Sequence, residues 1–150
     1  MSTPFTPYKS EQLNALYEFL FCDNLAYFES SSNGTANEQP WKTLFSKNAD
    51  EQALLEITND EQAESRVRNL AAVQLGAMGS TQQPQLSLLG VVIEVGMEQG
   101  LDTLAAFSDG TARYLNHAEN VIIWETATAE SNELIQNLWN ASITVVNKIG

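Results

Sequence analysis

The sequence holds one group of side chains that could carry out acid–base chemistry: Asp102, Arg113 and His117. A carboxylate beside an imidazole fixes the orientation and tautomer of the ring, which is half of the arrangement that a general base needs. Hydrolytic enzymes complete that arrangement with a nucleophile. The candidate nucleophile, Ser108, is six residues of extended strand away from Asp102, so the nucleophile is missing. We therefore interpret the three residues as a cross-strand charge cluster, and keep an enzyme that uses Asp102 and His117 as an alternative.

Metal and cofactor chemistry have little support in the sequence. The chain has one histidine and one cysteine, Cys22, whereas zinc sites combine several such ligands. Cys22 lies in an apolar helical run, where a thiol packs as a small hydrophobe, and a single cysteine forms no disulfide within the chain. Glycine-rich phosphate loops and HExxH are absent from the sequence. We expect no metal and no cofactor.

A predicted β-hairpin positions the charge cluster. Asp109-Gly110 stands between two apolar runs, which favours a two-residue type I′ turn, because glycine and aspartate tolerate the positive φ angles that this turn needs. In the resulting register Asp102 faces His117. Side chains alternate along each strand, so Arg113 is expected on the same face as both.

Two further strands flank the hairpin. Residues 90–95 and 121–125 are rich in β-branched side chains, which strands prefer, and short connections join all four runs. The sequence therefore predicts a four-stranded antiparallel β-meander over about residues 88–125. The two outer runs do not alternate between apolar and polar residues, so helices are needed to cover the faces, as in an α+β fold.

Helical patterns precede and follow the meander. Ser10 suits the N-cap of a helix that ends near Cys22, and about Ala129 to Lys148 forms a long C-terminal helix with an apolar stripe. We expect both helices to bury their stripes against the sheet. The residues expected to be nearly inaccessible are Leu16, Leu20, Leu138 and Trp139.

The sequence between the first helix and the meander is expected to contain short helices and loops. Residues 29–40 are polar and aperiodic, which predicts a loop. Residues 41–45 and a start at 48–51 suggest two helical elements, and Thr58 to Glu61 has the pattern of a capping box for a helix that ends near Met78, before Gly79. With an extended, flexible arm at 1–9 and a linker at 80–85, residues 1–150 are predicted to form a single domain.

The charge balance limits the partners. The chain carries 19 acidic and 7 basic residues, for a formal charge of −12, and such a surface repels nucleic acid and anionic membranes. We expect neither as a partner. No apolar run reaches the ~18 residues of a membrane span, and the first residues lack the pattern of a signal peptide. A cytoplasmic location is therefore expected, and the acidic composition, rich in Gln and Asn, suggests a bacterial protein.

These observations favour a non-enzymatic protein-interaction or regulatory module whose partner protein is basic. The alternative is a small-ligand-binding domain with a pocket between helices and sheet, lined by Tyr114, Trp124 and Trp139. The outermost strands of the meander, 90–95 and 121–125, are apolar edges, and such edges are templates for pairing. We therefore also expect a homodimer with two-fold symmetry.

Overall fold

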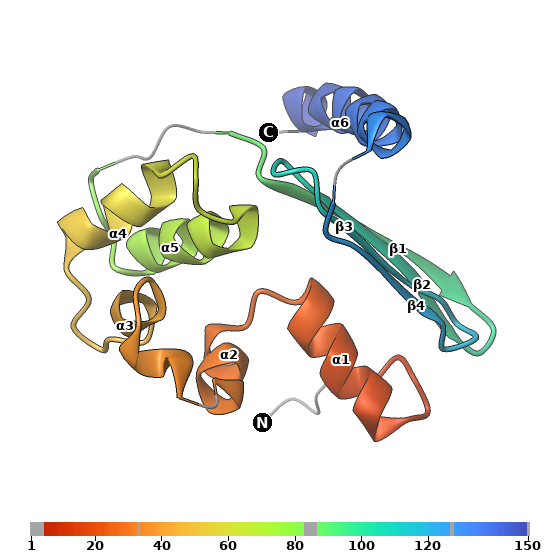
Figure 1. Cartoon of the computed structure of the whole chain (residues 1–150), viewed down its shortest axis with the longest axis horizontal. Coiled ribbons are helices and arrows are strands. Elements are labelled where there is room, and N and C mark those ends of the chain that lie inside the picture. Colours follow the sequence, from red (N-terminus) through yellow and green to blue (C-terminus); the bar gives the residue numbers. More distant parts are fainter. Residues whose placement is uncertain (1–4, 33, 83–86, 127, 150) are drawn as a thin grey trace. The chain divides into compact units, whose positions relative to one another are not determined.

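The computed structural model of the chain describes residues 5–32, 34–82, 87–126 and 128–149 (Figure 1). Its contacts divide the chain into two compact units, Met1–Phe21 with Gly90–Gly150 (unit 1) and Cys22–Leu89 (unit 2). The prediction that the two units make up a single domain stays a prediction. The start of the predicted arm (1–4) and half of the predicted linker at 80–85 (83–85) lie outside the described residues.

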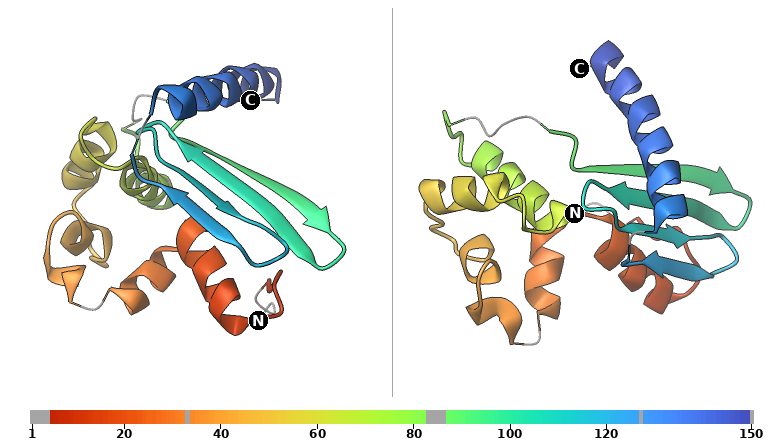
Figure 2. Two further views of the ribbon diagram at one scale, coloured as in Figure 1. Left: turned by 45° about the vertical axis from the view of Figure 1, so that its right-hand side comes forward. Right: turned by 45° about the horizontal axis from the view of Figure 1, so that its top comes forward.

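The predicted meander and the α+β class are confirmed. Unit 1 contains a four-stranded antiparallel sheet in the order β1-β2-β3-β4, so that β1 and β4 are the outermost strands (Figure 2). Its strands are β1 Gly90–Met97, β2 Gly100–Phe107, β3 Ala112–Leu115 and β4 Val121–Trp124.

The predicted two-residue turn is wrong by one residue. The N–H of Phe107 donates to the carbonyl of Thr111 at 2.9 Å, and the N–H of Gly110 donates to the carbonyl of Phe107 at 3.0 Å. The loop therefore has three residues and ends on Gly110 with φ 85°, a common alternative hairpin that needs glycine at this position. The side chain of Asp109 stabilises it by accepting from the N–H and the hydroxyl of Thr111.

The longer loop changes which residues share a face. Ala106 lies opposite Ala112 and Thr103 lies opposite Leu115, whereas the two-residue turn had placed Ala106 opposite Arg113. Because side chains alternate between faces, a shift of one residue moves every side chain of β3 to the other side of the sheet relative to β2.

One face of the sheet is covered by helix α1, Glu11–Phe21, as predicted. We call it the covered face. An Nη1 donor of Arg113 bonds the carbonyl of Leu20 at 3.1 Å, and the hydroxyl of Tyr17 donates to Glu94, so α1 packs on the side to which both strand residues point. Gly90 permits close packing here, because a Cβ at this position would lie 2.9 Å from the Phe107 ring. The buried side chains of this layer are Tyr17, Leu20, Phe21, Thr103, Ala105, Phe107 and Leu115.

The long C-terminal helix α6, Ala129–Ile149, is confirmed, but its expected burial is not. All of α6 lies in the described part of the chain, and none of its residues is buried. Leu20 is buried as predicted, whereas Leu16, Leu138 and Trp139 are only half-buried. An apolar stripe identifies the side of a helix that avoids water, but it does not establish that the same chain supplies enough surface to cover it.

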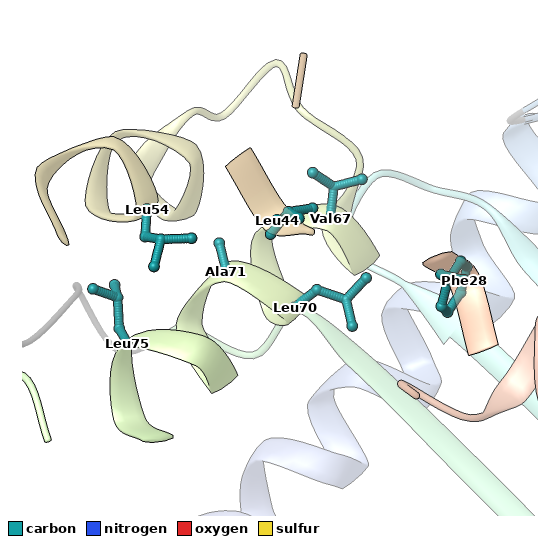
Figure 3. Close-up of a cluster of buried hydrophobic side chains, with 7 residues drawn as sticks. All are labelled: Phe28, Leu44, Leu54, Val67, Leu70, Ala71 and Leu75. Atoms are coloured by element: carbon teal, nitrogen blue, oxygen red, sulfur yellow. The ribbon is translucent and has the colours of Figure 1, made fainter. Parts of the chain in front are cut away.

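Unit 2 is helical and has its own core. Its elements are α2 Leu25–Ser31, η1 Thr35–Asn37, α3 Trp41–Leu44, α4 Glu51–Asn59 and α5 Ser65–Ala77. The predicted short helix at 41–45 and the helix start at 48–51 are confirmed, with the Asp50 side chain capping α4. Gly79 follows α5 with φ 69°, as its predicted C-terminal position requires. The core shown in Figure 3 consists of Phe28, Leu44, Leu54, Val67, Leu70, Ala71 and Leu75.

Two predictions in unit 2 are wrong. The predicted loop at 29–40 contains the end of α2 and the η1 turn; Ser30 and Ser31 are compatible with the helix end because their hydroxyls both donate to the carbonyl of Tyr27 at 2.8 Å. The predicted capping box does not form. Thr58 lies in the last turn of α4, where its hydroxyl donates to the carbonyl of Leu54 at 2.9 Å, and α5 begins only at Ser65.

Candidate functional site

The second face of the sheet, opposite α1, is apolar; its centre is buried at Ala106 and Ala112, and its outer strands are uncovered. We call it the open face. Alternation along the paired strands places on it Ile93 and Val95 of β1, Leu104 and Ala106 of β2, Ala112 and Tyr114 of β3, and Ile122 and Trp124 of β4. Ile93, Val95, Ile122 and Trp124 are all exposed. Exposed apolar side chains that gather on one face of a protein often mark a binding surface.

A groove of about 500 Å³ runs between the open face and the first half of α6. Its walls are apolar except near the start of the helix. Leu134 is 65% exposed and Trp124 is 39% exposed, so solvent reaches side chains on both sides of the groove. The lining residues are Leu104, Ala106, Ala112, Trp124, Thr128, Glu130, Ser131, Leu134, Ile135 and Leu138.

Two reciprocal hydrogen bonds cap the start of α6. The N–H of Ser131 donates to the Thr128 hydroxyl at 3.1 Å, and the N–H of Thr128 donates to the Ser131 hydroxyl at 2.8 Å. Each side chain thus satisfies a backbone donor of the other residue, as in a capping box. This reciprocal pair fixes the residue at which the helix begins, and Thr128 and Ser131 also line one end of the groove.

A polar cluster lies on the same face, where β2 begins. One carboxylate oxygen of Asp102 accepts from the backbone N–H of His117 at 2.9 Å and lies 2.7 Å from Nδ1 of the same histidine. The other oxygen accepts from the Tyr114 hydroxyl at 2.9 Å. The predicted neighbours Asp102 and His117 therefore do meet, and Tyr114 joins them.

These contacts shift two pKa values in opposite directions. The backbone N–H of His117, followed by its ring and then the Tyr114 hydroxyl, lowers the pKa of Asp102 because hydrogen bonds favour the ionised carboxylate. The pKa of Tyr114 is raised, mainly because its hydroxyl already donates to Asp102. Tyr114 and His117 both bond Asp102, so the cluster holds the turn at 116–120 to the start of β2.

Arg113 does not belong to this cluster. It lies on the covered face, where its guanidinium donates to the Leu20 carbonyl and lies 5.2 Å from the centroid of the Phe107 ring. The one-residue change in register explains the difference. Ser108 follows the far end of β2, roughly 20 Å of extended chain from Asp102. Among the described residues, no three histidine, cysteine or acidic side chains are grouped as a metal site would require.

The three residues that were predicted to line one pocket do not lie together. Trp124 lines the groove, the Tyr114 hydroxyl is bonded to Asp102, and Trp139 is half-buried on α6. The sequence reasoning missed the groove residues Leu104 and Ala106, because the wrong register separated them from Ala112. The apolar stripe of the last helix did contain the signal for Leu134, Ile135 and Leu138.

The polar cluster makes stability depend on acid pH. Because the folded pKa of Asp102 lies below its ordinary value of 3.8, its stabilising contribution is present above about pH 4 and is lost as the pH falls through the folded pKa. A carboxyl-carbon NMR titration should give a pKa below 3.8 for Asp102, and a higher one in Tyr114→Phe, which lacks one donor. A wild-type pKa at or above 3.8 would contradict the observed hydrogen bonds.

Comparison of the chain with protein-family models, with curated proteins and with solved structures finds no match. In the part of the chain that the structure describes, none of the helices has the length and apolar character needed to cross a membrane.

Proposed function

We propose that this chain is a non-enzymatic, cytoplasmic protein-interaction module that holds a segment of a partner protein in the groove between α6 and the open face. The observation that carries the proposal is the state of α6: a 21-residue helix with an apolar stripe and no buried residue in the described chain. Helices in proteins owe most of their stability to the packing of such a stripe. A partner segment that fills the groove would complete that packing.

The shape of the groove favours a polypeptide over a small molecule. Its volume of about 500 Å³ lies within the range of ligand pockets, which supports the small-ligand alternative. Ligand pockets, however, enclose most of their ligand, whereas this groove is open and continues onto the exposed apolar side chains of β4. An apolar helix or strand laid in such a groove covers this longer surface, as in helix-in-groove recognition.

The charges near the groove favour a basic partner. Glu125 precedes the groove helix, and Glu130 and Glu133 lie in its first turns, while Lys148 is the basic residue of α6. Acidic groups beside an apolar groove attract lysine and arginine that flank an apolar segment, and they disfavour acidic segments. The proposed occupant is therefore a segment with an apolar side and basic flanks.

Capture from a lysate of the source organism, with matched variants, tests this proposal. Leu134→Glu places a charge in the groove, and Val73→Glu places the same charge on α5 at a valine that is 55% exposed and outside the groove. We expect wild type and Val73→Glu to retain a partner protein at low salt, and high salt to release it. Leu134→Glu should not retain that protein. Equal retention by wild type and Leu134→Glu would contradict the proposal.

A further inference from the structure

The outer edge of β1 is open to pairing. β1 is an outermost strand eight residues long, and within the described residues no other strand pairs with its outer side. Natural proteins protect such edges with proline, bulges or several charges, because an apolar edge strand is a template for another chain. β1 has no proline, and its single charge is Glu94, whose carboxylate accepts the Tyr17 hydroxyl on the covered face.

Side chains on both faces of β1 are exposed as well. Val92 on the covered face is 46% exposed, and Ile93, Val95 and Met97 on the open face are also exposed. A strand added at this edge would place its own side chains beside these four and remove part of their apolar surface from water.

The second half of α6 supplies more apolar surface on the same side of unit 1. Residues 143–149 are exposed throughout, including Val145, Val146 and Ile149. The right-hand view of Figure 2 shows α6 running past β1 at its C-terminal end. The groove residues, in contrast, come from β2, β3, β4 and the first half of α6, so the two surfaces are separate.

We infer that two copies of this chain join across a two-fold axis through the outer edge of β1 and the second half of α6. β1 pairs antiparallel with its counterpart, and the two sheets become one sheet of eight strands. The open faces lie on one side of it, with both α6 helices above them. This inference goes beyond the proposed function and does not depend on it.

The single charge of β1 selects the register. A two-fold axis perpendicular to the sheet pairs residues of the same face, so it passes through one residue of β1. An axis through Glu94 would set two carboxylates directly opposite each other, which is unfavourable. An axis through Ile93 places Glu94 opposite the partner subunit's Val92 and keeps seven of the eight strand residues paired.

The sequence of α6 suits an antiparallel pair. In the second half of α6, the alternating three- and four-residue spacing of a helix–helix seam is followed by Ser142, Val145 and Ile149. The hydroxyl of Ser142 already donates to the Leu138 carbonyl at 2.8 Å, so its donor stays satisfied when the seam is covered.

The area available is sufficient for a dimer. The exposed parts of Val92, Ile93, Val95, Met97, Val145, Val146 and Ile149 amount to on the order of 600 Å² of apolar surface for each copy. Standard protein–protein interfaces bury about 800 Å² on each partner, polar atoms included, and strand pairing adds backbone atoms to the total. A second copy is therefore the occupant that completes the β1 edge.

Size exclusion with light scattering on the full chain tests the dimer and its register. Wild type should have twice the 16.5 kDa mass of one chain at micromolar concentration. Val92→Glu should be monomeric, because its carboxylate would face the partner subunit's Glu94, and Val92→Lys should stay dimeric because it would face the same group with opposite charge. Ile123→Glu is the matched control: it is 47% exposed, on the same face, but on the other outermost strand. It should stay dimeric.

Several outcomes would overturn the inference. These are a wild-type mass of 16.5 kDa at every concentration, a dimeric Val92→Glu, or a monomeric Val92→Lys. Circular dichroism verifies that each variant is folded. If Val92→Glu unfolds, amide exchange in β1 of wild type replaces it: protection of residues 90–97 should increase at least tenfold from nanomolar to tens of micromolar protein, and unchanged protection would reject the pairing.

Discussion

Replacing Leu115 with alanine is expected to lower the free energy of unfolding by about 2–5 kcal/mol. Leu115 is 0% exposed and lies on the covered face at the end of β3, opposite Thr103, which is equally buried. The substitution removes one methine and two methyl carbons from a layer closed by α1, so both transfer energy and packing contacts are lost. Urea unfolding followed by circular dichroism measures the effect.

Ile122→Ala provides the control, because Ile122 sits on the neighbouring strand β4 but on the open face, half-exposed. It should cost less than about 1 kcal/mol, since substitution at exposed positions seldom costs more. Equal losses for Leu115→Ala and Ile122→Ala would mean that the two faces of the sheet do not differ in cover as described.

Removing the Arg66 side chain should have the second large effect, about 2–3 kcal/mol for Arg66→Ala. The guanidinium is nearly buried in unit 2, where it donates to Asp23 at 3.2–3.3 Å and to the carbonyl of Cys22 at 3.1 Å. It also lies 5.0 Å above the ring of Phe28. The loss stays below that of a fully buried pair, because Asp23 is partly exposed and also accepts from Asn69.

Arg66→Lys separates charge from geometry. Lysine keeps the positive charge but cannot place both Nε and Nη2 donors on the Asp23 Oδ1 or a planar group over Phe28, so it should recover less than half of the loss. Thermal and urea unfolding of the three proteins give the comparison. Full recovery by lysine would show that charge alone matters at this position, contrary to the contacts of the guanidinium.

The meander was predictable because its signals are local. β-branched runs, short connections and Asp109-Gly110 between them all favour the same antiparallel sheet. The register of the hairpin could not be predicted in this way, because Asp-Gly suits both a two-residue turn and the three-residue loop that ends at Gly110 here. That single difference moved Arg113 to the covered face, while Asp102 and His117 still met, because the backbone and ring of His117 both reach the carboxylate.

The groove was only partly predictable, since it depends on surface that stays uncovered. The stripe of α6 was visible in the sequence, and so was the tryptophan at position 124. Whether other residues of the chain bury such a stripe depends on the packing of distant segments, and here α1 covers one face of the sheet while the other stays open. In unit 2, Thr58 bonded within its own helix rather than capping the next one, a competition that spacing alone does not decide.

Hydrogen exchange of the isolated chain, at a concentration at which it is monomeric, tests most directly that an apolar face is left open. The helix α6 has no buried residue in the described chain, whereas α5 contributes Val67, Leu70, Ala71 and Leu75 to a closed core. Amides of α6 should therefore exchange at least about 100-fold faster than those of α5. Protection of α6 equal to that of α5 would mean that the chain itself holds this helix as firmly as its core, and would contradict an unfilled binding face.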